Sequence, residues 1–253
     1  MASVRAMGDI SDDGFLGGRI RVLQPRRGFR AAIDSVLLPA AVDAGNGLDI
    51  LDAGLGVGVA ALCLCAREPR FSVTGVESQE DLAELARENA RRNSIRLDIQ
   101  STDLFSLPIG RMFDQVMTNP PYFEMNSGTK SPIETKARSM TGVRINDWVE
   151  ACIAHLKLGG MLTLIHRAEC EQEIVAALAR EAGDIEILPL LPRIGEMPKR
   201  ILVRARKHAP AGLKYWPGFV LHGDAMKYTD QAEAVLRHGA ELRWGDDKAP
   251  RTP

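Results

Sequence analysis

Leu48–Gly58, LDILDAGLGVG, is the stretch that decides the fold. Its first residues, Leu48–Leu51, are apolar except for Asp49 and predict a short buried strand. A glycine loop follows, and an apolar helical pattern runs from about Val57 to Arg67. Glycine lets the backbone turn tightly and come close to a ligand, and a helix behind the loop presents free N–H groups. The stretch therefore predicts a strand, a ligand-binding turn and a helix in succession.

Strands and helices continue to alternate after this unit. Further strands are predicted at 71–77, 95–101, 113–119, 159–167, 185–193 and 199–207, with helices at 78–93, 146–156 and 168–183. Alternation at this spacing predicts an α/β fold: a doubly wound, mostly parallel, Rossmann-like sheet of seven strands with helices on both faces. The last two strands have no helix between them, so we expect a hairpin with one antiparallel strand at the sheet edge.

The chain of 253 residues is long enough for one large domain with a substantial buried core. Hydrophobic residues make up 45% of it and charged residues 26%, which excludes disorder as the dominant state. We expect a flexible N-terminus at 1–18, an N-terminal arm and helix at 19–45, the α/β domain at 46–245 and a flexible tail at 246–253.

Cysteine usage and the lack of long apolar segments both predict a cytoplasmic protein. The four cysteines have no C-x-x-C spacing and are expected to be small buried hydrophobes in a reducing compartment. No stretch approaches the roughly 18 apolar residues that a membrane span needs, and the N-terminus lacks the apolar region of a secretory signal. The lack of a long apolar stretch predicts no membrane partner. The five histidines form no metal-spaced pair, so we also predict no metal site. The oligomeric state stays open.

The glycine loop has the pattern of one cofactor class. Gly54, Gly56 and Gly58 follow Asp52, whereas the dehydrogenase fingerprint would place its third glycine at position 59, which is Val. The resulting G-x-G-x-G, with an acid at the strand end, resembles the S-adenosylmethionine (SAM) loop of class I methyltransferases. A purely structural turn is the alternative interpretation.

Two more acids lie where the following strands end. Glu77 closes the strand at 71–77. A carboxylate there accepts hydrogen bonds from both ribose hydroxyls, of SAM or NAD alike. Asp103 follows the next strand, and it matches the place where methyltransferases of this class bind the adenine amine of the cofactor. The alternatives are an acid that starts a helix, for Glu77, and a turn residue, for Asp103.

The most specific motif is NPPY, which directly follows the strand FDQVMT. It consists of Asn119, Pro120, Pro121 and Tyr122. Two prolines stiffen the turn and donate no backbone hydrogen bonds. The side-chain oxygen of Asn119 and a proline carbonyl are two acceptors that can hold a planar NH2 group, and Tyr122 offers a face on which a flat base or amide stacks. Such acceptors favour the pyramidal, methyl-accepting amine as the transition state develops. The motif therefore predicts methyl transfer to an amino group.

Taken in this order, the glycine loop, Glu77, Asp103 and NPPY resemble the amino-group methyltransferases of the class I fold. Three flanking segments resemble, more narrowly, the bacterial adenine-N6 methyltransferases that act on valine tRNA: IDSVLL at 33–38, PKRILVRA at 198–205 and YTDQAEAVL at 228–236. The resemblance covers about residues 20–240.

The resemblance implies SAM as the cofactor and tRNA as the partner. It places Asp34 at the border of the SAM pocket and Asn119 between cofactor and substrate. It also implies a target adenine next to the anticodon, flipped out between Tyr122 and the cofactor. The loop after NPPY, FEMNSGTKSPIETKARSM, departs from the family pattern, which leaves the exact target open.

The distribution of charge is consistent with an RNA substrate, although the formal net charge is only −1. Residues 190–215 hold seven basic side chains and one acid, and residues 19–30 hold five arginines and no acid. Basic segments that converge near NPPY would hold phosphates. The residues predicted to bind RNA are Arg26, Arg27, Arg30, Lys199 and Arg200. An ordinary solvated face is the alternative.

Three other functions stay open at this point. Release-factor glutamine methyltransferases also use NPPY, because a glutamine amide is a planar NH2, but they usually carry a helical domain before the SAM loop. Guanine-N2 methyltransferases of rRNA share the chemistry and are usually longer. A SAM-binding protein without catalysis is the third possibility, and the intact NPPY argues against it.

Overall fold

A broad sheet with helices on both faces forms the body of the molecule in the computed structural model, which describes residues 9–28, 30–43, 45, 48–121, 143–223 and 227–245. The strands are β1 (Ile10–Phe15), β2 (Ile20–Pro25), β3 (Asp49–Ala53), β4 (Ser72–Glu77), β5 (Asp98–Ser101), β6 (Phe113–Thr118), β7 (Leu156–Arg167), β8 (Ala182–Leu191), β9 (Arg200–Lys207), β10 (Leu213–Tyr215) and β11 (Phe219–Val220). The helices are α2 (Asp34–Ala40), α3 (Val59–Arg67), α4 (Glu80–Arg92), α5 (Ile145–Ala154), α6 (Glu171–Leu178) and α7 (Asp230–His238), with 3-10 turns η1 (Leu16–Gly18), η2 (Leu104–Ser106) and η4 (Ala168–Cys170).

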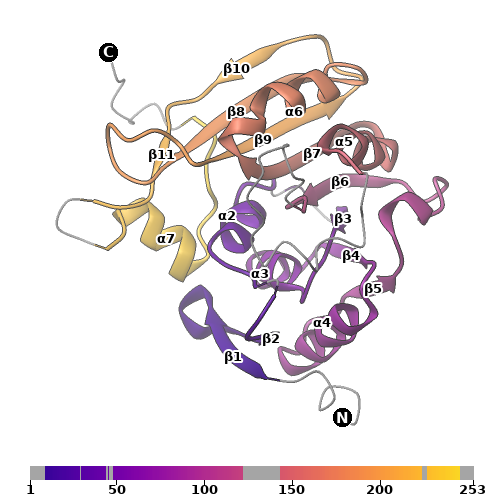
Figure 1. The fold of residues 1–253 in the computed structure, drawn as a ribbon, viewed down its shortest axis with the longest axis vertical. Coiled ribbons are helices and arrows are strands. Elements are labelled where there is room, and N and C mark those ends of the chain that lie inside the picture. Colours follow the sequence, from indigo (N-terminus) through magenta and orange to yellow (C-terminus); the bar gives the residue numbers. More distant parts are fainter. Residues whose placement is uncertain are drawn as a thin grey trace, which may run out of the picture.

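The topology of the main sheet confirms the doubly wound α/β fold. Within the described residues its order is β10-β8-β9-β7-β6-β3-β4-β5, and β11 also pairs with β8 (Figure 1). All neighbours are parallel except β9, which is antiparallel to both β7 and β8. β3 and β6 are adjacent, and the chain leaves them in opposite directions across the sheet, so this is the switch point where such sheets bind ligands.

Two details of the predicted sheet need correction. The described sheet has nine strands instead of seven, because β10 and β11 add short parallel segments outside β8. The antiparallel strand is β9, and it lies between β7 and β8 instead of at the edge. The hairpin was predicted correctly, but the returning strand folds inward, where β7 and β8 pair with its backbone and its apolar side chains are buried in the cores on both faces of the sheet.

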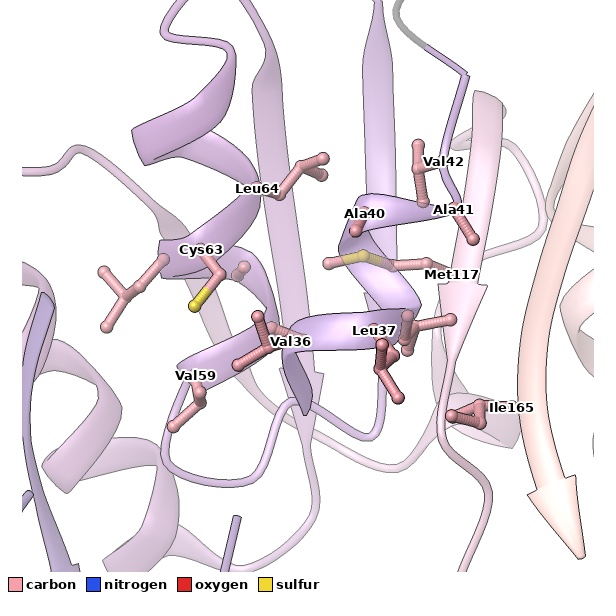
Figure 2. Close-up of a cluster of buried hydrophobic side chains, with 14 of the residues drawn as sticks. Val36, Leu37, Ala40, Ala41, Val42, Val59, Cys63, Leu64, Met117 and Ile165 are labelled. Atoms are coloured by element: carbon pink, nitrogen blue, oxygen red, sulfur yellow. The ribbon is translucent and has the colours of Figure 1, made fainter. Parts of the chain in front are cut away.

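Alternate residues of each central strand feed two separate cores, because side chains of a strand point to opposite faces. On β3, Ile50 joins the core under α2, α3, α4 and α7, and Leu51 joins the core under α5 and α6. Figure 2 shows the first core, where Val36 of α2 lies beside Val59 of α3 and Leu37 points toward Ile165 of β7. Each fully buried side chain of this kind contributes roughly 1.5–3 kcal/mol to stability.

The expectation that residues 1–18 are flexible is wrong for 10–18. Ile10–Phe15 form β1, which pairs antiparallel with β2 over six residues, and η1 follows with Leu16 buried. The sequence ISDDGF shows no strand-like apolar pattern, but its acids pair with arginines of β2 and the following loop. The predicted flexible segments at 1–8 and 246–253 lie outside the described residues. Among the residues that the structure describes, no helix is long and apolar enough to cross a membrane.

Candidate active site

The glycine loop crosses the end of β4 in a conformation that needs glycine. Gly54, Gly56 and Gly58 have φ of 83°, 57° and 88°, a left-handed region that other residues rarely adopt. The backbone N–H groups of Gly54 and Leu55 donate to the carbonyl oxygen of Val76, at 3.1 and 2.8 Å. The predicted glycine pattern therefore corresponds to a real backbone requirement.

The carboxylate of Glu77 holds the same loop from the end of β4. It accepts from the backbone N–H of Gly56 and from that of Gln79, each at 2.9 Å. Burial raises the pKa of Glu77, and these backbone donors oppose the shift. Because a carboxylate has about four lone-pair sites, Glu77 keeps acceptor capacity for a ligand beside the loop.

Asp52, at the end of β3, is a buried acid with an unsatisfied oxygen. Its side chain is 2% exposed, and its Oδ2 atom has no hydrogen-bond partner among the described residues. Burial, opposed by the backbone N–H of Ala61 and assisted by the charge of Glu77, raises the pKa of Asp52 to about 7. A buried carboxyl oxygen without a partner is costly and points to a missing donor.

The raised pKa of Asp52 predicts a pH-dependent stability. The folded carboxyl keeps its proton up to about pH 7, whereas the unfolded one releases it near 3.8. The contribution of Asp52 to stability is therefore fully present below about pH 4 and is lost as the pH rises through 7. We expect Asp52→Asn to remove this dependence. Relative to wild type, the free energy of unfolding of the variant should therefore rise by roughly 3–4 kcal/mol between pH 4 and pH 8. Urea unfolding of both proteins at each pH measures it, and a constant difference would contradict the assignment.

Asp103 has the local role of a turn residue in addition to its predicted one. Its Oδ1 atom accepts from the backbone N–H of Phe105 at 2.9 Å and caps η2. The half-exposed ring of Phe105 meets the ring of Trp148 edge-on, with centroids 6.1 Å apart. This places Asp103 on a short, braced turn at the carboxyl edge of the sheet.

The first residues of NPPY follow β6, the strand beside β3. Thr118 pairs in register with Ala53, and its hydroxyl donates to the carbonyl oxygen of that residue at 2.7 Å. The indole N–H of Trp148 donates to the same hydroxyl at 3.0 Å, and a Cβ at Gly54 would lie 3.2 Å from the indole ring. Helix α5 thus binds the end of β6 to the glycine loop, and Asn119 comes next in the chain.

Of the four NPPY residues, three are described. Pro120 is buried, while Asn119 and Pro121 are partly exposed. Tyr122 and most of the loop after it lie outside the described residues. The structure therefore brings Asn119 and Pro120 to the switch point together with Asp52 and the glycine loop.

The predicted RNA-binding arginines are largely paired with acids. Arg26 pairs with Asp9 at 2.9 Å, and Arg30 pairs with Asp13 at 2.9 Å. The N-terminal acids thus neutralise much of the arm, and its positive charge is smaller than the count of arginines predicted. Arg27 is exposed.

At the start of β9, Arg200 and Lys199 differ in their surroundings. The guanidinium of Arg200 pairs with the carboxylate of Asp34 at 3.1 Å, which joins β9 to the first turn of α2. Two residues to which we assigned separate roles, cofactor binding and RNA binding, are therefore in direct contact. Lys199 is exposed.

Comparison with known proteins decides the family. The family model for the methyltransferase small domain matches residues 32–188, which is more than half of the chain and includes the glycine loop, Glu77, Asp103 and NPPY. The chain belongs to the methyltransferase small domain family.

Several curated relatives of this family member carry the same name. Proteins named tRNA1(Val) (adenine(37)-N6)-methyltransferase are similar to it in Glaesserella parasuis, at 28% identity over 67% of this chain and 73% of the relative, and in Actinobacillus succinogenes, at 30% identity over 62% and 69%.

Solved structures show the same fold. A predicted O-methyltransferase from Agrobacterium tumefaciens is 27% identical with a TM-score of 0.66, covering 80% of this chain and 94% of its own. A Thermus thermophilus 16S rRNA N2 G1207 methyltransferase, in complex with AdoMet and guanosine, is 18% identical with a TM-score of 0.54, over 79% and 50%. Together with the family match, this fold identifies the chain as a methyltransferase.

The site of this methyltransferase small domain fits SAM. The Oδ2 atom of Asp52 has no hydrogen-bond partner among the described residues, and a cationic ligand would supply one. The glycine loop carries no Cβ atom over the end of β3, which leaves room for a ligand there. In the described residues, no cluster of His, Cys, Asp or Glu could hold a metal ion.

Three residues that matter for the site were missed from the sequence. Thr118 and Trp148 join β6, α5 and the glycine loop, as described above. The amide of Asn89, fully buried on α4, donates to the carbonyl oxygens of Val57 and Leu23 at 3.0 and 2.9 Å. An amide among the apolar positions of an amphipathic helix was the available signal for Asn89.

Proposed function

We propose that this chain transfers the methyl group of SAM to the exocyclic N6 amine of an adenine in tRNA, in the anticodon loop next to the anticodon. The observation that carries the proposal is the position of Asn119 and Pro120, directly after the strand that Thr118 joins to the glycine loop. The names of the curated relatives support adenine and tRNA in particular.

The chemistry asks for acceptors at the amine. When bound, SAM supplies an electrophilic methyl group on a sulfonium. The side-chain oxygen of Asn119 and the carbonyl oxygen of Pro120 accept hydrogen bonds from the adenine NH2 and favour a pyramidal nitrogen, whose lone pair is then available to the methyl carbon. Tyr122 offers a face for the flipped base. The N6 nitrogen releases one proton to solvent as the new C–N bond forms, and the electron pair of the broken C–S bond stays on sulfur.

The cofactor-binding roles follow the geometry of the loop. The side chain of Asp52 faces the cationic part of the cofactor, and Glu77 accepts from the ribose hydroxyls. Asp103 binds the adenine amine with the oxygen that does not cap η2, and Asp34 and Asn119 border the pocket. Gly54, Gly56 and Gly58 allow the backbone to approach the cofactor.

RNA binding is proposed first for two exposed basic side chains, Lys199 just before β9 and Arg27 in the loop after β2. Arg26, Arg30 and Arg200, which pair with acids, form a second set. Arg200 contacts Asp34, so an acidic substitution there would also disturb α2. Lys199→Glu is therefore the cleaner probe of phosphate contact. A tRNA substrate also implies a cytoplasmic location.

A parallel transfer assay tests the substrate class. Labelled SAM is incubated with the purified protein and, separately, with bulk tRNA lacking this modification, with rRNA and with a release factor. We expect label in tRNA. Label only in protein would establish the glutamine alternative, and label in rRNA would establish the guanine-N2 alternative. The absence of label from every substrate would indicate a SAM-binding protein without catalysis.

A further inference from the structure

The turn between β8 and β9, residues 192–199, exposes apolar side chains in a basic setting. Ile194 is 76% exposed and Met197 is 83% exposed, the latter the most exposed large apolar side chain among the described residues. Arg193 and Lys199 flank them and are also exposed, and Arg193 forms an ion pair with Glu196 of the same turn at 3.6 Å. Exposing two large apolar side chains to water on one turn is unfavourable, so such a pair often marks a contact surface.

The turn lies at the same edge of the sheet as NPPY. β6 is parallel to β7, with Thr118 opposite Leu164, and β7 is antiparallel to β9, with Leu164 opposite Val203. The residues before Arg200 therefore extend past the level of Thr118 by about 10 Å, at roughly 3.3 Å per residue. Across the sheet, β9 is two strands from β6, which is about 10 Å. The turn thus lies at the same edge of the sheet as Asn119, where the proposed function places the target base.

The base of the turn is held in place on both sides. The carbonyl oxygen of Lys199 accepts from the backbone N–H of Ala168 at 3.2 Å, which continues the β7–β9 ladder. Arg200 is held by Asp34. At the tip, the backbone N–H of Glu196 donates to the carbonyl oxygen of Arg193 at 3.1 Å, and Gly195 has a φ of 79°. A braced turn presents its exposed side chains in a defined direction.

We infer that Ile194 and Met197 form a contact surface for unstacked nucleotides beside the target adenine, and this inference rests on the proposed function. An RNA loop is the ligand that combines both chemistries present here: apolar base faces that pack on Ile194 and Met197, and phosphates that pair with Arg193 and Lys199. The two apolar side chains contribute to substrate affinity, and the chemistry stays with Asn119.

The test compares two double variants in tRNA methylation. Ile194→Ser with Met197→Ser removes the proposed contact. Ile109→Ser with Leu158→Ser is the matched control, because those side chains are 69% and 80% exposed and precede β6 or begin β7, at the opposite edge of the sheet. We expect the first variant to raise the KM for tRNA about tenfold, with kcat and SAM affinity within twofold of wild type. The increase should persist at high salt, since apolar contact is not screened.

Three results would overturn the inference. A substrate surface at this turn is contradicted if the KM for tRNA is unchanged, or if the KM of the control variant rises equally. It is also contradicted if kcat or the melting temperature falls in place of the KM effect. The wild-type arm separates this outcome from failure of the proposed function: if wild type transfers no methyl group to tRNA, the function and the inference both fall, whereas normal wild-type transfer with an unaffected variant removes the inference alone.

Discussion

Replacing Asn119 by Ala is expected to reduce kcat for methyl transfer to tRNA by about 10²–10³-fold, because the variant loses an acceptor that acts in the transition state. SAM affinity should change by less than fivefold, since Asp52, Glu77 and the glycine loop are untouched. The prediction follows from the position of Asn119 directly after Thr118, whose hydroxyl joins β6 to β3. Single-turnover transfer of labelled methyl groups measures the rate, and calorimetry measures SAM binding.

Asn119→Asp is the matched control for this prediction. It keeps an acceptor oxygen in about the same place, and we expect it to retain more activity than Asn119→Ala. Full activity in the Ala variant would remove Asn119 from the mechanism. Loss of SAM binding in both variants would instead show that Asn119 acts mainly by holding the cofactor and not on the amine.

Replacing Asn89 by Leu is expected to lower the free energy of unfolding by about 3 kcal/mol or more. The carboxamide of Asn89 makes three hydrogen bonds with backbone groups, because the backbone N–H of Leu23 donates to it at 2.8 Å and it donates to the carbonyl oxygens of Leu23 and Val57. Each buried backbone group left without a partner costs roughly 1–3 kcal/mol. Urea unfolding at constant pH measures the loss.

Asn93, one turn later on α4, offers a matched comparison. Its amide bonds the backbone of Arg21 in the same way, at 2.9 and 2.7 Å, but the site is exposed and water can replace it. We expect Asn93→Leu to cost less than about 1 kcal/mol. We also expect Asn89→Leu, and not Asn93→Leu, to weaken SAM binding, because Asn89 alone reaches the glycine loop at Val57. Equal effects of the two substitutions would contradict this account of how α4 supports the loop.

Local requirements are what made part of this molecule predictable. The glycines at 54, 56 and 58 were predictable because positive φ excludes most other residues, and all three have it. NPPY was predictable as the end of β6, because a strand followed by two prolines must stop there. The hairpin of the last two long strands followed from the absence of a helix between them.

The features that escaped prediction depend on contacts between distant segments. β1 pairs with β2, and its acids meet arginines of β2, of the following loop and, far along the chain, Arg92. No local pattern in ISDDGF records these contacts. β9 inserts inside the sheet because its apolar side chains need neighbours on both sides. The pairing of Arg200 with Asp34 spans more than 150 residues. A charge count by segment overstated the free positive charge for the same reason.

Identification of the methylated nucleoside tests the central claim most directly. Labelled SAM, the purified protein and tRNA that lacks the modification are incubated, and the RNA is digested to nucleosides and separated by chromatography. The account predicts that the label elutes as N6-methyladenosine and disappears when the Asn119→Ala variant replaces the wild-type protein. Label in N2-methylguanosine, or no label in RNA while a protein substrate accepts it, would contradict the account.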